Sequence, residues 1–105
     1  MLEEIYKKLK TVGIPFSYLK FNTSQKPPFC VYYENSTNIR GADNLNMIRQ
    51  TGITIELYTE TKNPELERRI EALFNDREIT KSEDIQIEDE NMIEVVFEIE
   101  TIDKF

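Results

Sequence analysis

The chain contains no histidine and no tryptophan, and it has only one cysteine and three glycines among its 105 residues. Histidine is the commonest general base and the commonest transition-metal ligand, so its absence disfavours most hydrolytic and zinc-dependent sites. The single, scattered glycines exclude a glycine-rich phosphate-binding loop. The lone Cys30 cannot form an intramolecular disulfide, and in the apolar run 29–33 we expect an inert strand residue.

Basic residues are also scarce, since 13 lysines and arginines stand against 20 aspartates and glutamates and leave a formal net charge of −7. Binding to the phosphate backbone of nucleic acids needs clustered basic side chains, so that class is disfavoured. No apolar run approaches the roughly 20 residues that cross a bilayer, and the charged start does not resemble a signal peptide. We therefore expect a soluble protein made in the cytosol, with no metal, no cofactor and no membrane contact.

The length fits one domain over residues 1–105. Hydrophobic residues make up 39% of the chain, below the average of about 45–50% for globular domains. A short chain with few apolar residues buries little surface on folding. This predicts either a thin core or a core that neighbouring subunits complete, and we favour the second.

Apolar periodicity predicts two helices. Residues 2–9 repeat at helical spacing, and Gly13 and Pro15 end the first helix. The second helix, 64–76, has Asn63 as its N-cap and proline at its first position. Its apolar stripe consists of Leu66, Ile70, Leu73 and Phe74, and we expect Glu65, Glu67, Arg68, Arg69 and Glu71 to lie mostly off that stripe.

Alternation of apolar and polar residues predicts the strands. They cover residues 16–21, 29–34 and 47–61, and a terminal hairpin follows over 85–99 with its turn at Asp89-Glu90-Asn91. The stretch 35–46, rich in polar residues, is predicted to be a long loop. The fold class is therefore α+β, with an antiparallel or mixed sheet of about four to five strands and two helices packed on one face.

The second face of that sheet is predicted to be charged. It should carry Thr54, Glu56, Tyr58, Glu94, Val96, Glu98 and Glu100. Residues 78–103 contain ten acidic residues and one basic residue, Lys81. Three interpretations stay open: a solvated hairpin that resists edge pairing, a surface that meets a basic neighbour, or a mimic of DNA phosphates.

Several short motifs follow one another along nearly the whole chain. They are Ile14-Pro15-Phe16, the run 28–33, Ala42-Asp43-Asn44, the strand 55–59, Lys62-Asn63 with Glu67 and Glu71, Asp89-Glu90-Asn91-Met92, and the closing strand. In this order the motifs resemble the tail terminator (tail-completion, head–tail joining) proteins of long-tailed phages and prophages of Gram-positive bacteria. The order and spacing carry the resemblance, because each motif alone is short.

The resemblance implies a non-enzymatic subunit of an oligomeric ring, typically a hexamer, that ends tail-tube growth and connects the tail to the head. Its implied partners are copies of itself, the tail tube and neck or connector proteins. It would reside in the host cytoplasm during assembly and in the tail or neck of the mature virion. We expect interface residues in the polar loop and in the terminal hairpin, namely Arg40, Asp43, Asn44, Glu94, Glu98 and Glu100.

Two other classes remain as alternatives. A small acidic inhibitor that mimics DNA would bind a host DNA-binding protein or nuclease through Glu94, Glu98 and Glu100. An enzyme that uses paired carboxylates would need two acids whose pKa values are pushed apart in a cleft. The sequence distinguishes no such pair, so we expect no enzymatic activity.

Overall fold

The structure, a computed structural model, describes residues 2–41 and 48–104 and shows two helices with a six-stranded sheet. The elements follow in the order α1 (Leu2–Lys10), β1 (Phe16–Tyr18), β2 (Phe29–Arg40), β3 (Ile48–Thr59), α2 (Pro64–Leu73), β4 (Ile79–Lys81), β5 (Ile85–Ile87), a 3₁₀ turn (Glu88–Glu90) and β6 (Met92–Lys104). The predicted α+β class is confirmed, and the sheet has one strand more than the upper expectation.

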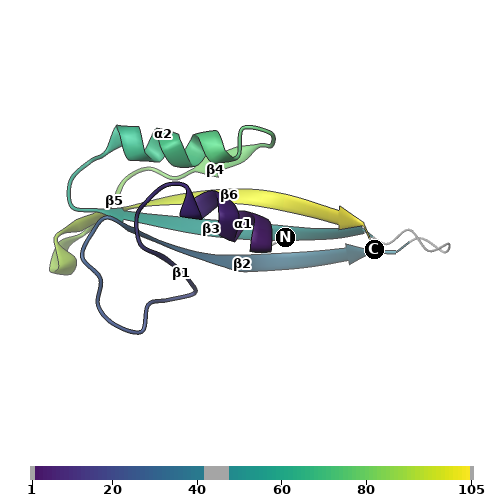
Figure 1. Cartoon of the computed structure of the whole chain (residues 1–105), viewed down its shortest axis with the longest axis horizontal. Helices are drawn as coiled ribbons and strands as arrows, with labels where there is room; N and C mark the ends of the chain where they lie inside the picture. The colour runs from purple at the N-terminus through teal and green to yellow at the C-terminus, as the bar shows by residue number, and fades with distance from the viewer. Residues whose placement is uncertain (1, 42–47, 105) are drawn as a thin grey trace.

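The sheet is mixed, with strand order β1-β2-β3-β6-β4, while β5 pairs with the beginning of β6. β1 runs parallel to β2, and all other pairs are antiparallel. β2, β3 and β6 have 12, 12 and 13 residues and follow the long dimension of the molecule, which is 52 Å. Figure 1 shows these three strands continuing past both helices.

Both helices lie on one face of the sheet, because their buried side chains meet the same set of strand positions in a single core. Ile53, Ile55 and Leu57 of β3 are the centre of this core, as the alternation predicted. The core continues with Ile5, Leu9 and Val12 from α1, Leu66, Ile70 and Phe74 from α2, Cys30 and Tyr32 from β2, and Val95, Phe97 and Ile99 from β6. Cys30 is thus a buried strand residue as predicted, and burial raises the pKa of its thiol to about 12.

The helix boundaries follow local chemistry. The side chain of Asn63 accepts the backbone N–H of Leu66 at 3.1 Å, which confirms the predicted N-cap of α2. α2 ends at Leu73, three residues before the predicted end, because Phe74 leaves the helical conformation and turns fully into the core. α1 is followed by Gly13 with a φ of +87°, a conformation that favours glycine. Among the described helices, none is long and apolar enough to cross a membrane.

The predicted loop 35–46 is wrong for its first six residues. β2 continues through a bulge at Asn35, and residues 36–40 pair with residues 48–52 of β3. Within the bulge, Asn35 Nδ2 donates to Thr54 Oγ1 at 2.7 Å. Asparagine and serine resemble turn residues in a sequence, but here the partner strand satisfies the backbone that a loop would expose to water. Residues 42–47 lie outside the described part of the chain.

Two short strands also differ from the prediction. β1 ends at Tyr18 instead of residue 21, because Leu19 adopts a φ of 69° and turns the chain away. β4 was not predicted, since its three residues are too few for a visible alternation. β4 pairs with residues 97–99 of β6 and places Ile79 against the core.

Gly52 tolerates no side chain at its place opposite the bulge. An added Cβ would overlap Asn35 Oδ1 and lie 2.8 Å from Ser36 Oγ. We expect Gly52→Ala to lower the free energy of unfolding by about 1–3 kcal/mol, as overpacking does, measured by urea unfolding. The same substitution in an Asn35→Ala background should cost less, and an equal cost in both backgrounds would exclude the overlap as the cause.

Candidate functional site

The face of the sheet opposite the helices is acidic. No helix of the described chain covers it, and its three long strands supply most of its surface. Within residues 29–38, 48–59 and 92–102, the outward positions hold four glutamates and no lysine or arginine. These are Glu56 on β3 and Glu94, Glu98 and Glu100 on β6, which confirms the predicted charged face. We call them the sheet-face glutamates.

Three carboxylates on the helix side have cationic partners from other parts of the chain, whereas the sheet-face glutamates have none within 4.0 Å among the described residues. On the helix side, Glu4 pairs with Arg77, Glu71 with Lys81, and Glu67 with both Lys62 and Lys81. The negative charge of the sheet-face glutamates is therefore not offset by ion pairs among the described residues, whereas that of Glu4, Glu67 and Glu71 is.

Two of the sheet-face glutamates share one tyrosine hydroxyl. Tyr58 Oη lies 3.0 Å from Glu56 Oε1 and 3.0 Å from Glu94 Oε2, and Tyr33 Oη donates to Glu56 Oε2 at 2.9 Å. One hydroxyl carries one hydrogen, so Tyr58 donates to only one of the two carboxylates. Glu56 has a hydroxyl partner at each oxygen, Tyr33 Oη at Oε2 and Tyr58 Oη at Oε1. Glu94 therefore shares a single donor, the Tyr58 hydroxyl, with Glu56.

The pKa values in this cluster point in the same direction. Burial raises the pKa of Glu94 most, the hydrogen bond with Tyr58 lowers it, and the charge of Glu56 raises it again, which leaves it above its ordinary value. Burial and the contacts with Glu56 likewise raise the pKa of Tyr58 and of Tyr33, so both phenols stay protonated as donors.

This arrangement predicts the effect of Glu94→Gln. The amide is neutral and still bonds to Tyr58, so we expect the free energy of unfolding at neutral pH to rise by up to about 1 kcal/mol. A carboxyl group whose pKa is raised in the folded state binds its proton more tightly there than in the unfolded chain. Its ionisation therefore destabilises the folded protein, and this cost grows as the pH rises. The gain should therefore vanish as pH falls through that raised pKa towards about 4.3, the ordinary value for glutamate. Urea unfolding at several pH values tests this, and a pH-independent gain would contradict it.

Two hollows flank the cluster. One, of about 580 Å³, lies beside Gly52, which has no side chain to fill the space, and it is bordered by Glu98, Glu100 and the exposed Ile102. The other, of about 400 Å³, is bordered by aromatic side chains, with Phe29 stacked on Tyr58 at 4.8 Å. In the described residues, no group of three or more histidines, cysteines or acids is placed to hold a metal ion. Both hollows are open and suit surface contacts better than the enclosure of a small substrate.

The structure brings together only part of the predicted interface. Glu94 belongs to the tyrosine cluster, and Glu98 and Glu100 are exposed on the same face of β6. Arg40 is the last residue of β2, opposite Ile48. Asp43 and Asn44 lie outside the described residues.

Glu56, Tyr33 and Tyr58 were not predicted as site residues. The signal that would have found them is the β3–β6 register, which sets Tyr58 directly opposite Glu94. Sequence patterns do not contain this register, because the two strands are separated by α2, β4 and β5.

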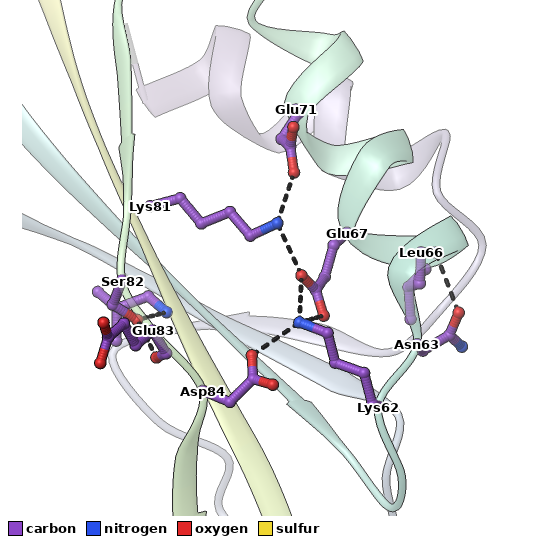
Figure 2. A network of polar contacts seen from close by, with 10 residues as sticks. Lys62, Asn63, Leu66, Glu67, Glu71, Lys81, Ser82, Glu83 and Asp84 are labelled. Atoms are coloured by element: carbon purple, nitrogen blue, oxygen red, sulfur yellow. Dashed lines mark hydrogen bonds and ion pairs between the residues drawn. The ribbon is translucent and has the colours of Figure 1, made fainter.

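Three residues of the motif series, Lys62, Glu67 and Glu71, meet in a second polar cluster that is structural (Figure 2). Glu67 is wrongly predicted to lie off the buried side of α2, since its side chain is only 1% exposed. Its carboxylate lies 2.9 Å from Lys62 Nζ and 2.8 Å from Lys81 Nζ. The same two lysines reach on to Asp84 and Glu71, at 2.7 and 3.0 Å. These ion pairs therefore link α2 to Lys81 in β4 and, through Lys62, to Asp84 just before β5.

Comparisons with known proteins show similarity of fold alone. No protein-family model matches the chain, and no curated protein is similar enough to match. Among solved structures, a chain of "Virion of native gene transfer agent (GTA) particle" is similar with a TM-score of 0.56 and 10% sequence identity, over 96% of this chain and 92% of that one. A second structure, whose name states no function, has a TM-score of 0.55 and 12% identity, over 97% of this chain and 86% of that one. At such identities the likeness establishes a shared fold.

Proposed function

We propose that this protein is a non-enzymatic virion assembly protein, a ring-forming tail terminator or head–tail joining subunit. The observation that carries the proposal is the fold match to a chain of a gene transfer agent virion, which spans nearly the full length of both chains. The motif order that resembles tail terminators supports the same assignment. The two lines are independent, because sequence identity to the matched chain is only 10%.

The architecture supports assembly as the function. The described domain is a two-layer fold with one bare sheet face, and its long strands continue past the helices (Figure 1). Surfaces of this kind suit contacts with neighbouring subunits. The proposed partners are further copies of the chain, the tail tube and the neck or connector proteins.

The proposal is tested in cells that carry the gene. Particles should contain the protein, detectable by mass spectrometry of purified virions. Deletion of the gene should leave filled heads without joined tails, together with tails of uncontrolled length in electron micrographs, and a plasmid copy should restore normal particles. Normal particles after deletion would refute the proposal.

A second candidate is favoured by the sheet-face glutamates alone. A mimic of DNA phosphates would bind a basic DNA-binding protein in a salt-sensitive way, and substitution of Glu94, Glu98 and Glu100 by glutamine would abolish that binding. Two of the four carboxyl groups are tied to Tyr58, which leaves only Glu98 and Glu100 without a hydrogen-bonded partner among the described residues. This candidate therefore has less support.

A further inference from the structure

We infer that the acidic sheet face of one copy binds the helix layer of a second copy, with Glu98 and Glu100 set against Lys7 and Arg68. For the virion this inference rests on the proposed function, since it names the surface through which the ring subunits would meet. As a statement about self-association it is tested on the purified protein alone.

The sheet face combines charged and apolar side chains, as protein–protein interfaces do. Its outward positions combine unpaired carboxylates with apolar and aromatic side chains, among them Val96, Tyr58 and Ile102, of which Ile102 is 61% exposed. β2, β3 and β6 have 12, 12 and 13 residues, so at about 3.3 Å per residue they form a face roughly 40 Å long. Three strands at a spacing of about 4.8 Å set its width, and the three-residue strands β1 and β4 widen it only locally.

The helix layer supplies the complementary charge. Lys7 and Lys10 on α1 and Arg68 on α2 are exposed. No carboxylate of the described residues lies within 4.0 Å of these three side chains. Lys8 and Arg69, in contrast, are engaged within the fold, since they donate to the carbonyl oxygens of Leu73 and Val12. Lys7, Lys10 and Arg68 therefore offer unpaired positive charge on the helix layer. Lys20 and Lys26 are also exposed and unpaired among the described residues, but they lie in the loop after β1, where Lys20 borders the hollow beside Tyr58.

Charge also selects the geometry of association. A symmetric sheet-to-sheet contact would set glutamates against glutamates, and a symmetric helix-to-helix contact would set cations against cations. Juxtaposed like charges disfavour both arrangements. The sheet-to-helix contact pairs opposite charges and uses two different patches of each copy. Such a contact repeats from copy to copy, and it forms a ring if the rotation between copies closes and a filament if it does not.

The test uses two charge-reversal variants of the full chain. The sheet-face variant is Glu98→Lys with Glu100→Lys, and the helix-layer variant is Lys7→Glu with Arg68→Glu. All four side chains are exposed, so circular dichroism and thermal melting should show native folding. Sedimentation velocity over a concentration series up to about 1 mM, where even a Kd of 1 mM is detected, measures association.

We expect each variant alone to associate at least about tenfold more weakly than the natural protein. A 1:1 mixture should recover association, because the basic sheet face of one variant then meets the acidic helix layer of the other. Association of the natural protein should weaken with added salt, as the Debye length falls from about 10 Å at 0.1 M to about 3 Å at 1 M. A matched control, Glu60→Lys with Glu83→Lys, changes the net charge equally in exposed loops and should associate normally.

Three results would overturn the inference. They are a natural protein that stays monomeric throughout the series, a sheet-face variant that associates like the natural protein, and a mixture that gains nothing over its components. The second result would fit a sheet face that lines the lumen of a ring. None of them touches the proposed function, which stands or falls with the particles of the deletion strain.

Discussion

Replacing both Lys62 and Lys81 by methionine is expected to lower the free energy of unfolding by about 3–5 kcal/mol, the cost of breaking a buried ion pair from one side. Glu67 is 1% exposed, and these two ammonium groups are its only cationic partners among the described residues. Methionine keeps most of each side chain's apolar length but leaves the carboxylate buried without a counter-charge. Domains of this kind are stable by about 5–15 kcal/mol, so urea unfolding will resolve the loss.

The matched control removes the unpaired negative charge of Glu67. Adding Glu67→Gln to the double substitution should recover part of the lost stability, because a buried neutral amide costs less than a buried unpaired carboxylate. Single replacement of either lysine should cost less than half of the double replacement, since the remaining lysine still neutralises Glu67. A triple variant no more stable than the double would show that packing of the lysine side chains, and not charge, holds α2 in place.

The pH dependence of this cluster gives a second readout with a definite sign. Burial raises the pKa of Glu67, but the hydrogen bonds from Lys81 and Lys62 lower it more, so its folded pKa lies below its ordinary value. The stability that Glu67 contributes is therefore present above about pH 4.3 and lost as pH falls through the folded pKa. In the double variant only burial acts and raises the pKa, so stability should increase on acidification. The difference between the two proteins should shrink from pH 7 to pH 4.

The parts of the fold that were predictable are those where local patterns agree with tertiary contacts. Asn63 and Pro64 start α2 by their own chemistry, and the alternation 53–58 is an ordinary half-buried strand. Glu67 was misplaced because its burial depends on Lys62 and Lys81, which lie outside the helix in the sequence and reach Glu67 only in the folded chain, so no helical pattern contains their positions. The bulge at Asn35 was missed for a similar reason, since residues 36–40 are strand only through pairing with β3.

The candidate site was predictable in its charge but not in its geometry. Alternation placed Glu94 and Glu98 on one face of the last strand, and the structure confirms that placement. The sharing of Tyr58 between Glu56 and Glu94 required the non-local β3–β6 register. The positions of the cations could be known only from the ion pairs of the folded chain. Lys81 is the one basic residue of an acidic stretch in the sequence, but in the structure it pairs with Glu67 and Glu71 of α2 and does not lie on the sheet face.

The acidic stretch 78–103 has no single role, because its carboxylates lie in two different parts of the structure. Asp84 binds Lys62 and helps to fasten α2, whereas Glu94, Glu98 and Glu100 lie on the uncovered face. The proposed assembly function would use both properties, a helix layer that stays attached to the sheet and a sheet face that remains open to a neighbour. The internal ion pairs serve the first property, and the unpaired glutamates are available for the second.

The attachment of both helices also depends on Phe74, and Phe74→Ala is expected to lower the free energy of unfolding by about 3–5 kcal/mol. The ring is fully buried in the core that joins α1, α2 and the sheet. Lys8 Nζ lies 5.4 Å and Arg77 Cζ 5.7 Å from the ring centroid, so the ring also meets two cations. Alanine would leave a cavity at the point where α2 ends. Urea unfolding measures the loss.

Phe74→Leu separates the two contributions of this side chain. Leucine fills much of the space but presents no aromatic face to Lys8 and Arg77, so we expect a smaller cost of about 1–2 kcal/mol. The hydrogen bond from Lys8 Nζ to the Leu73 carbonyl, 2.7 Å long, does not involve the ring and should persist in both variants. The dependence of unfolding on urea should keep its slope, because a change in midpoint alone reports stability. If leucine costs as much as alanine, the cations hold the helices together through the ring and the filled volume contributes little.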